Sequence, residues 1–147
     1  MQPRPENDLL YLLIILESIG KIEKYSHGFN NSVLFYQHQD QLNFNATLLL
    51  LANIGEQTSK VSDQTKEKYP DVQWQKAKDM RNRIVHDYTG IDFDITFEIV
   101  KKELPEFKNK IHSIIKTELQ TGVFKKEELD VAKASKYYSH VDFNLWM

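Results

Sequence analysis

One nine-residue segment of the sequence carries an unusual concentration of side chains suited to phosphate and proton chemistry. Between Met80 and Tyr88 lie two guanidinium groups, an amide, an imidazole and a phenol. Guanidinium groups bind phosphate through charge-assisted, often bidentate hydrogen bonds. An imidazole, whose ordinary pKa is about 6.5, can donate or accept a proton at neutral pH. The segment is therefore a candidate phosphodiester site, and the alternative is a polar helix end that hydrogen-bonds its neighbours.

Helical spacing predicts which of these side chains share a face. Arg81 and Tyr88 are seven residues apart, about two turns, so a continuous helix would place both on one stripe. Asn82 and His86 are four residues apart and would also be neighbours. Arg81 and His86 are five apart, or about 140° around the axis. One helix does not easily direct both at one point, whereas two copies meeting across a symmetry axis could line a shared cleft.

The motif Arg81-Asn82-x3-His86-x-Tyr88 resembles the Arg-x4-His-x-Tyr motif of HEPN-domain ribonucleases, specifically the HepT toxin family. The residues around the motif agree with this resemblance over roughly residues 7 to 118. They are Ile54-Gly55-Glu56, Lys68-Tyr69-Pro70 and Trp74 before the motif, and Thr89-Gly90-Ile91-Asp92 after it.

The resemblance implies a metal-independent RNA endonuclease without a cofactor, with its site at the interface of a homodimer. Such enzymes activate the ribose 2′-hydroxyl against the adjacent phosphate and leave a cyclic phosphate end. On this pattern His86 is the general acid and base, and Arg81 stabilises the charge on the phosphate. Asn82 orients His86 or the phosphate.

The resemblance also implies a protein partner. HepT toxins pair with MntA, a minimal nucleotidyltransferase antitoxin that adenylylates the tyrosine of the motif, and this role falls to Tyr88. A bulky anionic group on Tyr88 would neutralise Arg81 and fill the cleft. The rival hypothesis is a catalytically silent HEPN dimer that docks a nucleotidyltransferase, with Arg81 and His86 serving the interface.

Other residues near the motif have structural or supporting interpretations. Glu56 is expected to form an ion pair with Arg81 or Arg83 across the bundle, and Trp74 to lie in the core. Arg83 is either a solvated charge or a second RNA contact. Lys78 contributes to a basic surface on the motif helix, so we count it as a possible RNA contact.

Composition restricts the class of protein. The chain has 147 residues, 19 Lys+Arg and 21 Asp+Glu, which gives a net charge of −2. This balance excludes histone-like binding to nucleic acid and requires a local basic patch instead. The sequence has no cysteine, no paired HxxxH or HExxH histidines and no calcium-loop or phosphate-loop motif. It therefore predicts no disulfide framework, no metal site and no nucleotide cradle.

The pattern of apolar residues predicts an all-α fold, a four- to five-helix up-and-down bundle over residues 1–118 with a C-terminal extension over 119–147. The first expected helix runs from Asn7 or Asp8, as a cap, to Tyr25, and the second from Asn43 to about Tyr69. The third runs from Trp74 or Gln75 to Tyr88 and is closed by Gly90. The remaining helices are expected over Phe93–Leu104 and Phe107–Ile115, separated at Pro105, and over Lys125–Lys136. The aromatic tail from Tyr137 to Trp146 covers the dimer edge, contacts the antitoxin or packs on the bundle.

The first predicted helix is apolar on all sides over Leu9–Leu16. Two explanations stay open, a central helix of the bundle or a subunit interface. Eight apolar residues are too few for a membrane span, which needs about 20. Glu6 and Asp8 precede the run where a signal peptide carries positive charge, so we expect a cytoplasmic protein.

Overall fold

The computed structural model describes residues 3–147, which form helices and contain no strand, so the predicted all-α class is confirmed for this part of the chain. The α-helices are α1 (Asp8–Ser26), α2 (Ser32–Gln37), α3 (Leu42–Lys60), α4 (Asp63–Lys68), α5 (Trp74–His86), α6 (Phe93–Glu98), α7 (Leu104–Gln120) and α8 (Lys126–Ala134). Single 3-10 turns cover Pro5–Asn7, Tyr88–Gly90 and Phe143–Trp146, and a π-helical segment covers Ile99–Glu103.

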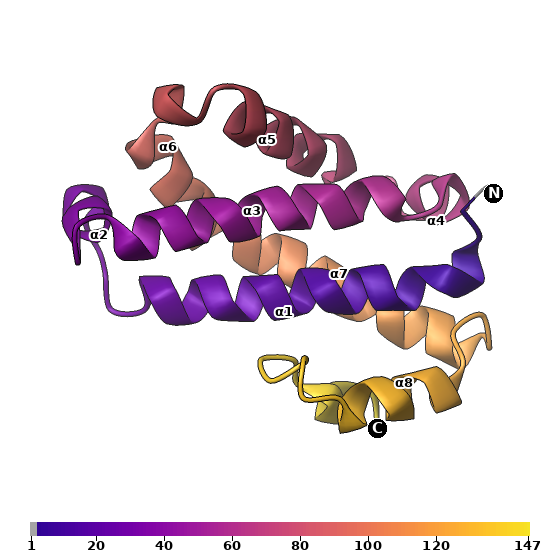
Figure 1. Ribbon diagram of the computed structural model, residues 1–147. Helices are drawn as coiled ribbons and strands as arrows, with labels where there is room; N and C mark the ends of the chain where they lie inside the picture. The colour runs from indigo at the N-terminus through magenta and orange to yellow at the C-terminus, as the bar shows by residue number, and fades with distance from the viewer. Residues whose placement is uncertain (1–2) are drawn as a thin grey trace.

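Helix α3 lies between α1 and α5 and packs against both, while α7 contacts α1 (Figure 1). Helix α1 supplies the centre of the core, with Leu9, Leu12, Leu13, Ile15, Ile19 and Ile22 all at 0% exposure. Burial within a single chain thus accounts for most of the apolar first half of α1, with Leu10 left 50% exposed. Of the two explanations for that half, this packing favours the central helix of the bundle.

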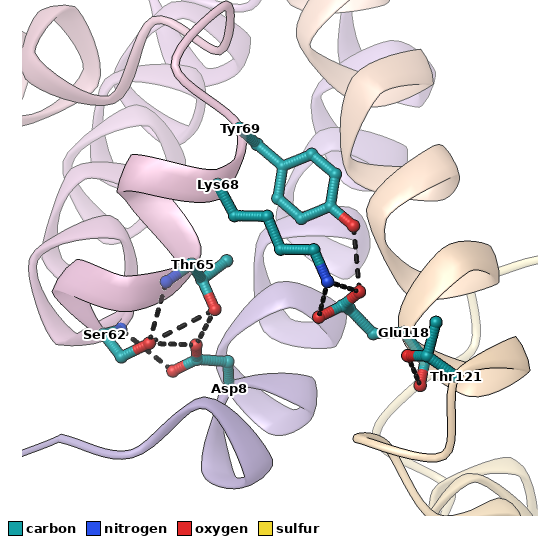
Figure 2. Close-up of polar contacts among 7 residues, drawn as sticks. All are labelled: Asp8, Ser62, Thr65, Lys68, Tyr69, Glu118 and Thr121. Carbon is teal, nitrogen blue, oxygen red and sulfur yellow. Dashed lines mark hydrogen bonds and ion pairs between the residues drawn. The ribbon is translucent and has the colours of Figure 1, made fainter.

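The predicted helix from Asn43 to Tyr69 is wrong in its second half, because α3 ends at Lys60 and α4 is a separate element. The buried carboxylate of Asp8 explains the break (Figure 2). Asp8 Oδ1 accepts from the Ser62 amide at 2.9 Å, and Oδ2 accepts from the hydroxyls of Ser62 at 2.7 Å and Thr65 at 2.6 Å. Ser62 in turn caps α4. The side chains of Asn7 and Asp8 were expected to cap α1; Asp8 holds the start of α4 instead.

A second buried carboxylate fixes the segment that leads into α5. Glu118 of α7 accepts from the Lys68 ammonium at 2.8 Å and from the Tyr69 hydroxyl at 2.9 Å (Figure 2). Burial raises the pKa of Tyr69 to about 12, and the hydrogen bond to Glu118 acts in the same direction. Trp74 is buried, as predicted, and its indole N–H donates to the Tyr69 carbonyl at 2.9 Å. Helix α5 therefore begins at a point tied to α7.

The expected separation of two helices at Pro105 is wrong. Helix α6 continues through the π-helical segment Ile99–Glu103 into α7, with Pro105 in the first turn of α7. Pro105 has no N–H for the carbonyl four residues earlier, and the Leu104 N–H donates to the Ile99 carbonyl with the wider π spacing. Of the apolar residues that follow helical spacing in these helices, Val100, Leu104, Ile111, Ile114 and Ile115 are buried. Phe93, Phe97 and Phe107 are half-buried and pack against the core.

The C-terminal extension packs on the bundle. The buried Glu17 carboxylate of α1 accepts from the His140 backbone N–H and pairs with its Nδ1, both at 2.7 Å. The Trp146 indole donates to the His112 carbonyl at 3.2 Å, and Phe143 is buried. Of the alternatives for this tail, packing on the bundle is therefore realised. The division of the chain into a bundle over residues 1–118 and an extension over 119–147 stays a prediction. Residues 1 and 2 of that bundle lie outside the part of the chain that the structure describes.

Within residues 3–147, none of the helices has the length and apolar character needed to span a bilayer.

The Asp8→Ala substitution should destabilise the protein by about 2–4 kcal/mol, because it leaves the buried amide of Ser62 and two hydroxyls without their acceptor. Urea unfolding followed by circular dichroism measures this loss. The matched control is Glu6→Ala, which removes an exposed carboxylate two residues earlier and should change stability by less than about 0.5 kcal/mol. Equal stability of the two variants would contradict the bracing role of Asp8.

Candidate functional site

Helix α5 ends at His86, so the prediction that it continues to Tyr88 is wrong. Asp87 leaves the helical conformation, with φ −143° and ψ 52°, and Tyr88 begins a 3-10 turn. The stripe that Arg81 and Tyr88 would share on a continuous helix is therefore not formed. Gly90 was expected to close the helix, but it lies within the turn. A Cβ there would approach an Asp87 carboxylate oxygen to 2.3 Å, and the exposed Asp87 side chain would have to move to accommodate it.

The Tyr88 phenol is held by α3. Its hydroxyl donates to Asn45 Oδ1 at 2.6 Å, and the residue is 49% exposed. Asn45 was missed by the sequence analysis. A partial signal existed, since Asn45, Leu49 and Glu56 follow the helical spacing i, i+4, i+11 and so share the outward face of α3. The anchor of Tyr88 is thus an amide on a helix distant in sequence.

Arg81 is held by the other half of α3. Its Nε lies 3.4 Å from Glu56 Oε2, which confirms the expected ion pair, and its Nη1 donates to Asn82 Oδ1 at 3.1 Å. Asn45 and Glu56 are eleven residues apart, about 16 Å along the axis of α3. The Tyr88 hydroxyl and the Arg81 guanidinium are therefore anchored at well-separated points of the same helix.

A glycine allows α3 and α5 to approach each other at Arg81. A Cβ on Gly55 would lie 2.3 Å from Arg81 Cβ and 2.5 Å from the Ala77 carbonyl oxygen. The backbone of α3 therefore occupies the space that a side chain would need. This contact fixes the base of the Arg81 side chain next to Glu56, the residue that follows Gly55.

His86 is the last residue of α5 and is exposed. Because α5 is α-helical from Arg81 to His86, the two residues differ by about 140° in direction. Asn82 shares the face of His86, but its side-chain oxygen accepts from Arg81. A single chain thus brings Arg81, Asn82 and Glu56 together and leaves His86 on a different face.

The expected basic surface of α5 is partly neutralised. Lys76 forms an ion pair with Glu103, and Arg81 pairs with Glu56, while Arg83 is exposed. Lys78 faces Lys66 of α4. The pKa of Lys66 is lowered, first by burial and second by the positive charge of Lys78. Of the basic side chains on α5, Lys78 and Arg83 therefore supply the positive charge that an acidic partner within residues 3–147 does not already neutralise.

Exposed apolar side chains lie beside these polar groups. Leu49 of α3 is 72% exposed and Val85 of α5 is 52% exposed. Leu49 lies one turn from Asn45 on α3, and Val85 lies one turn from Arg81 on α5, so both lie close to the polar contacts of the candidate site. Patches of this kind mark interaction sites in soluble proteins. We call Leu49, Val85 and Tyr88 the α3–α5 apolar patch.

Within the described residues 3–147, no three side chains of His, Cys, Asp or Glu gather into a group that could hold a metal ion. The chemistry available from the chain itself is charge-assisted phosphate binding by Arg81 and proton transfer by His86.

The family model and the relatives that match this chain all have ribonuclease names. The model of the family described as HepT-like, ribonuclease HepT-like, matches residues 15–114. The "Probable ribonuclease HepT" of Thermococcus cleftensis is 26% identical over 106 residues, covering 72% of this chain and 94% of that protein. A "Putative RNase" of Methanocaldococcus jannaschii is 30% identical over 114 residues, covering 76% and 91%.

A longer relative, also from Methanocaldococcus jannaschii, carries the name "Gamma-glutamylcyclotransferase and putative RNase". It is 32% identical over 128 residues, which cover 87% of this chain and 51% of that protein. The chain thus spans about half the length of this relative. No solved structure matches the chain.

The Gly55→Ala substitution should destabilise the protein by about 1–3 kcal/mol, because the added methyl group collides with α5. At a solvent-exposed position in the middle of a helix, the same change would stabilise the protein by about 1 kcal/mol. The sign of the change in unfolding free energy therefore reports whether α5 contacts Gly55. Urea unfolding measures the effect, and Ser59→Ala, at an exposed position one turn later, is the control. A gain in stability for Gly55→Ala would refute the close approach of α3 and α5.

Proposed function

This chain belongs to the HepT-like ribonuclease family, and from that premise we propose that it is a metal-independent RNA endonuclease acting at the interface of a homodimer. The observation that carries the proposal is the complete Arg81-x4-His86-x-Tyr88 motif at the exposed end of α5. Two relatives with ribonuclease names match 72% and 76% of this chain. We further propose that the enzyme is the toxin of a toxin–antitoxin pair.

In the proposed reaction the ribose 2′-hydroxyl attacks the adjacent phosphorus. His86 accepts the 2′ proton, the bond from phosphorus to the 5′ oxygen breaks, and that oxygen takes a proton from the imidazolium. The products are a 2′,3′-cyclic phosphate and a 5′-hydroxyl. Arg81 binds the non-bridging oxygens and stabilises the charge that develops on them. Glu56 and Asn82 hold the guanidinium in place as positioning residues.

The divergence of Arg81 and His86 supports a site built from two chains. The two residues point about 140° apart on one helix, so a second copy related by a two-fold axis would supply the missing partner to each. The α3–α5 apolar patch includes Val85, which is one turn from Arg81 and next to His86 in the chain, and it would provide a surface for such an interface. Lys78 and Arg83 are the further RNA contacts in this proposal.

Adenylylation of Tyr88 by an MntA-type nucleotidyltransferase is the proposed means of inhibition. The half-exposed phenol is available to an enzyme. Esterification would remove the O–H that donates to Asn45 and would place an anionic nucleotide beside Leu49 and Val85. Because Tyr88 lies beyond the end of α5, we attribute inhibition chiefly to obstruction of the α3–α5 apolar patch and the shared cleft, rather than to direct neutralisation of Arg81.

The central experiment is cleavage of labelled RNA in excess EDTA. Cleavage should persist, and His86→Ala should reduce its rate by about 10²–10⁴-fold, because proton transfer is lost. Arg81→Ala should weaken both RNA binding and turnover. His27→Ala, which removes an exposed histidine at the end of α1, should cleave like the parent protein. Loss of cleavage under chelation would refute metal independence, and an active His86→Ala would favour the docking-module hypothesis.

The dimer is tested by Leu49→Asp. A charge at a position that is 72% exposed in one chain should leave the fold intact and disfavour the apolar interface. Light scattering should then show a dimer for the parent protein and a monomer for Leu49→Asp. Leu145→Asp, in the C-terminal segment, is the control for an equally drastic change at an exposed leucine and should stay dimeric. A monomeric parent at micromolar concentration would exclude the composite site.

The role of Tyr88 is tested by Tyr88→Phe, which keeps the ring and removes the acceptor oxygen. Cleavage should be reduced far less than in His86→Ala, and adenylylation by the nucleotidyltransferase should be abolished. In cells this variant should stay toxic when the antitoxin is present, while the parent protein is neutralised. Mass spectrometry detects the adenylyl group on Tyr88. Modification of Tyr88→Phe to the parent level would show that another residue is the acceptor.

A further inference from the structure

A groove of about 690 Å³ lies between the first half of α1 and helix α8. Apolar side chains line it, with Leu10 and Tyr11 from α1 and Val131 and Tyr138 from the C-terminal extension. Leu10 is 50% exposed and Val131 is 73% exposed. Two large apolar side chains at the surface of one groove are unfavourable in water and indicate a surface that is covered in use.

The groove is remote from the motif. In Figure 1, α8 lies on one side of α1 and α5 lies on the far side of α3. The family match ends at residue 114, before α8 begins. The groove is thus formed by an element outside the matched region, and its occupant would leave the Arg81 and His86 end of the molecule free.

The charges at the groove are of one sign. Glu127 and Glu128 line it together with Val131, because these positions share one face of α8. Lys126 and Lys133 lie on the opposite face by the same periodicity. Within residues 3–147, neither glutamate takes part in an ion pair. Two carboxylates without an ion-pair partner in this part of the chain therefore line the groove beside its apolar side chains.

We propose that this groove binds a partner protein through a short amphipathic segment with apolar side chains on one face and lysine or arginine at its edge. The apolar residues of the segment would cover Leu10 and Val131, and its basic side chains would pair with Glu127 and Glu128. Helix α8 has nine residues, about 13 Å in length, so the groove accommodates two to three turns of a helix.

The test is a selection from a phage-displayed library of random 12-residue peptides on the intact protein. Enriched peptides should carry a net positive charge and large apolar residues at helical spacing. Their binding should weaken by about tenfold or more in Val131→Glu, and similarly in the double variant Glu127→Lys, Glu128→Lys. Lys126→Gln, on the opposite face of α8, is the control and should bind like the parent protein. Circular dichroism verifies that each variant is folded.

Two results would overturn the proposal. Enriched peptides without basic residues, or peptides that bind Val131→Glu as well as the parent protein, would show that the groove does not select a basic amphipathic segment. A dimer of the parent protein that dissociates on Val131→Glu substitution would assign the groove to a second copy of this chain. Neither result depends on RNA cleavage, so the proposed ribonuclease activity and this binding site can fail separately.

Discussion

The Arg81 side chain can meet Glu56 because Gly55 leaves no side chain between α3 and α5. A Cβ at that position would lie 2.3 Å from the Cβ of Arg81, so the two helices approach at their backbones. The other features of the candidate site depend on this contact. It sets the distance between α3 and α5. That distance in turn determines where the Tyr88 turn contacts Asn45 and where Val85 lies relative to α3.

The same contact explains why one chain does not complete the site. Holding Arg81 against α3 directs His86 about 140° away on the same helix, toward solvent rather than toward the guanidinium. In the proposed mechanism, a phosphodiester that needs both groups finds them on two copies. The Tyr88 hydroxyl donates to Asn45, at a point of α3 well removed from Glu56. The proposed modification of the phenol would therefore obstruct the proposed interface without displacing Arg81.

Local periodicity made the helical class and the apolar face of α7 predictable, because each depends on residues within a few turns. The start of α5 was also predictable, since the break at Pro70 marks it in the sequence, although contacts with Glu118 of α7 hold it in place. The Glu56–Arg81 pair was also predictable, since opposite charges on neighbouring helices have few alternatives. The end of α3 at Lys60 was not, because it depends on Asp8, 54 residues before Ser62. Tyr88 was misplaced for a related reason: nothing between His86 and Tyr88 is a strong helix breaker, and the phenol finds its partner on α3.

Mixing two inactive variants tests the central claim, that the site combines Arg81 of one chain with His86 of another. Arg81→Ala and His86→Ala proteins would be unfolded together, refolded and assayed for RNA cleavage. Random pairing makes half of the dimers mixed, and each mixed dimer holds one intact site of two, so the account predicts about a quarter of the parent activity. Activity no greater than that of the separate variants would contradict the account and place Arg81 and His86 in independent roles.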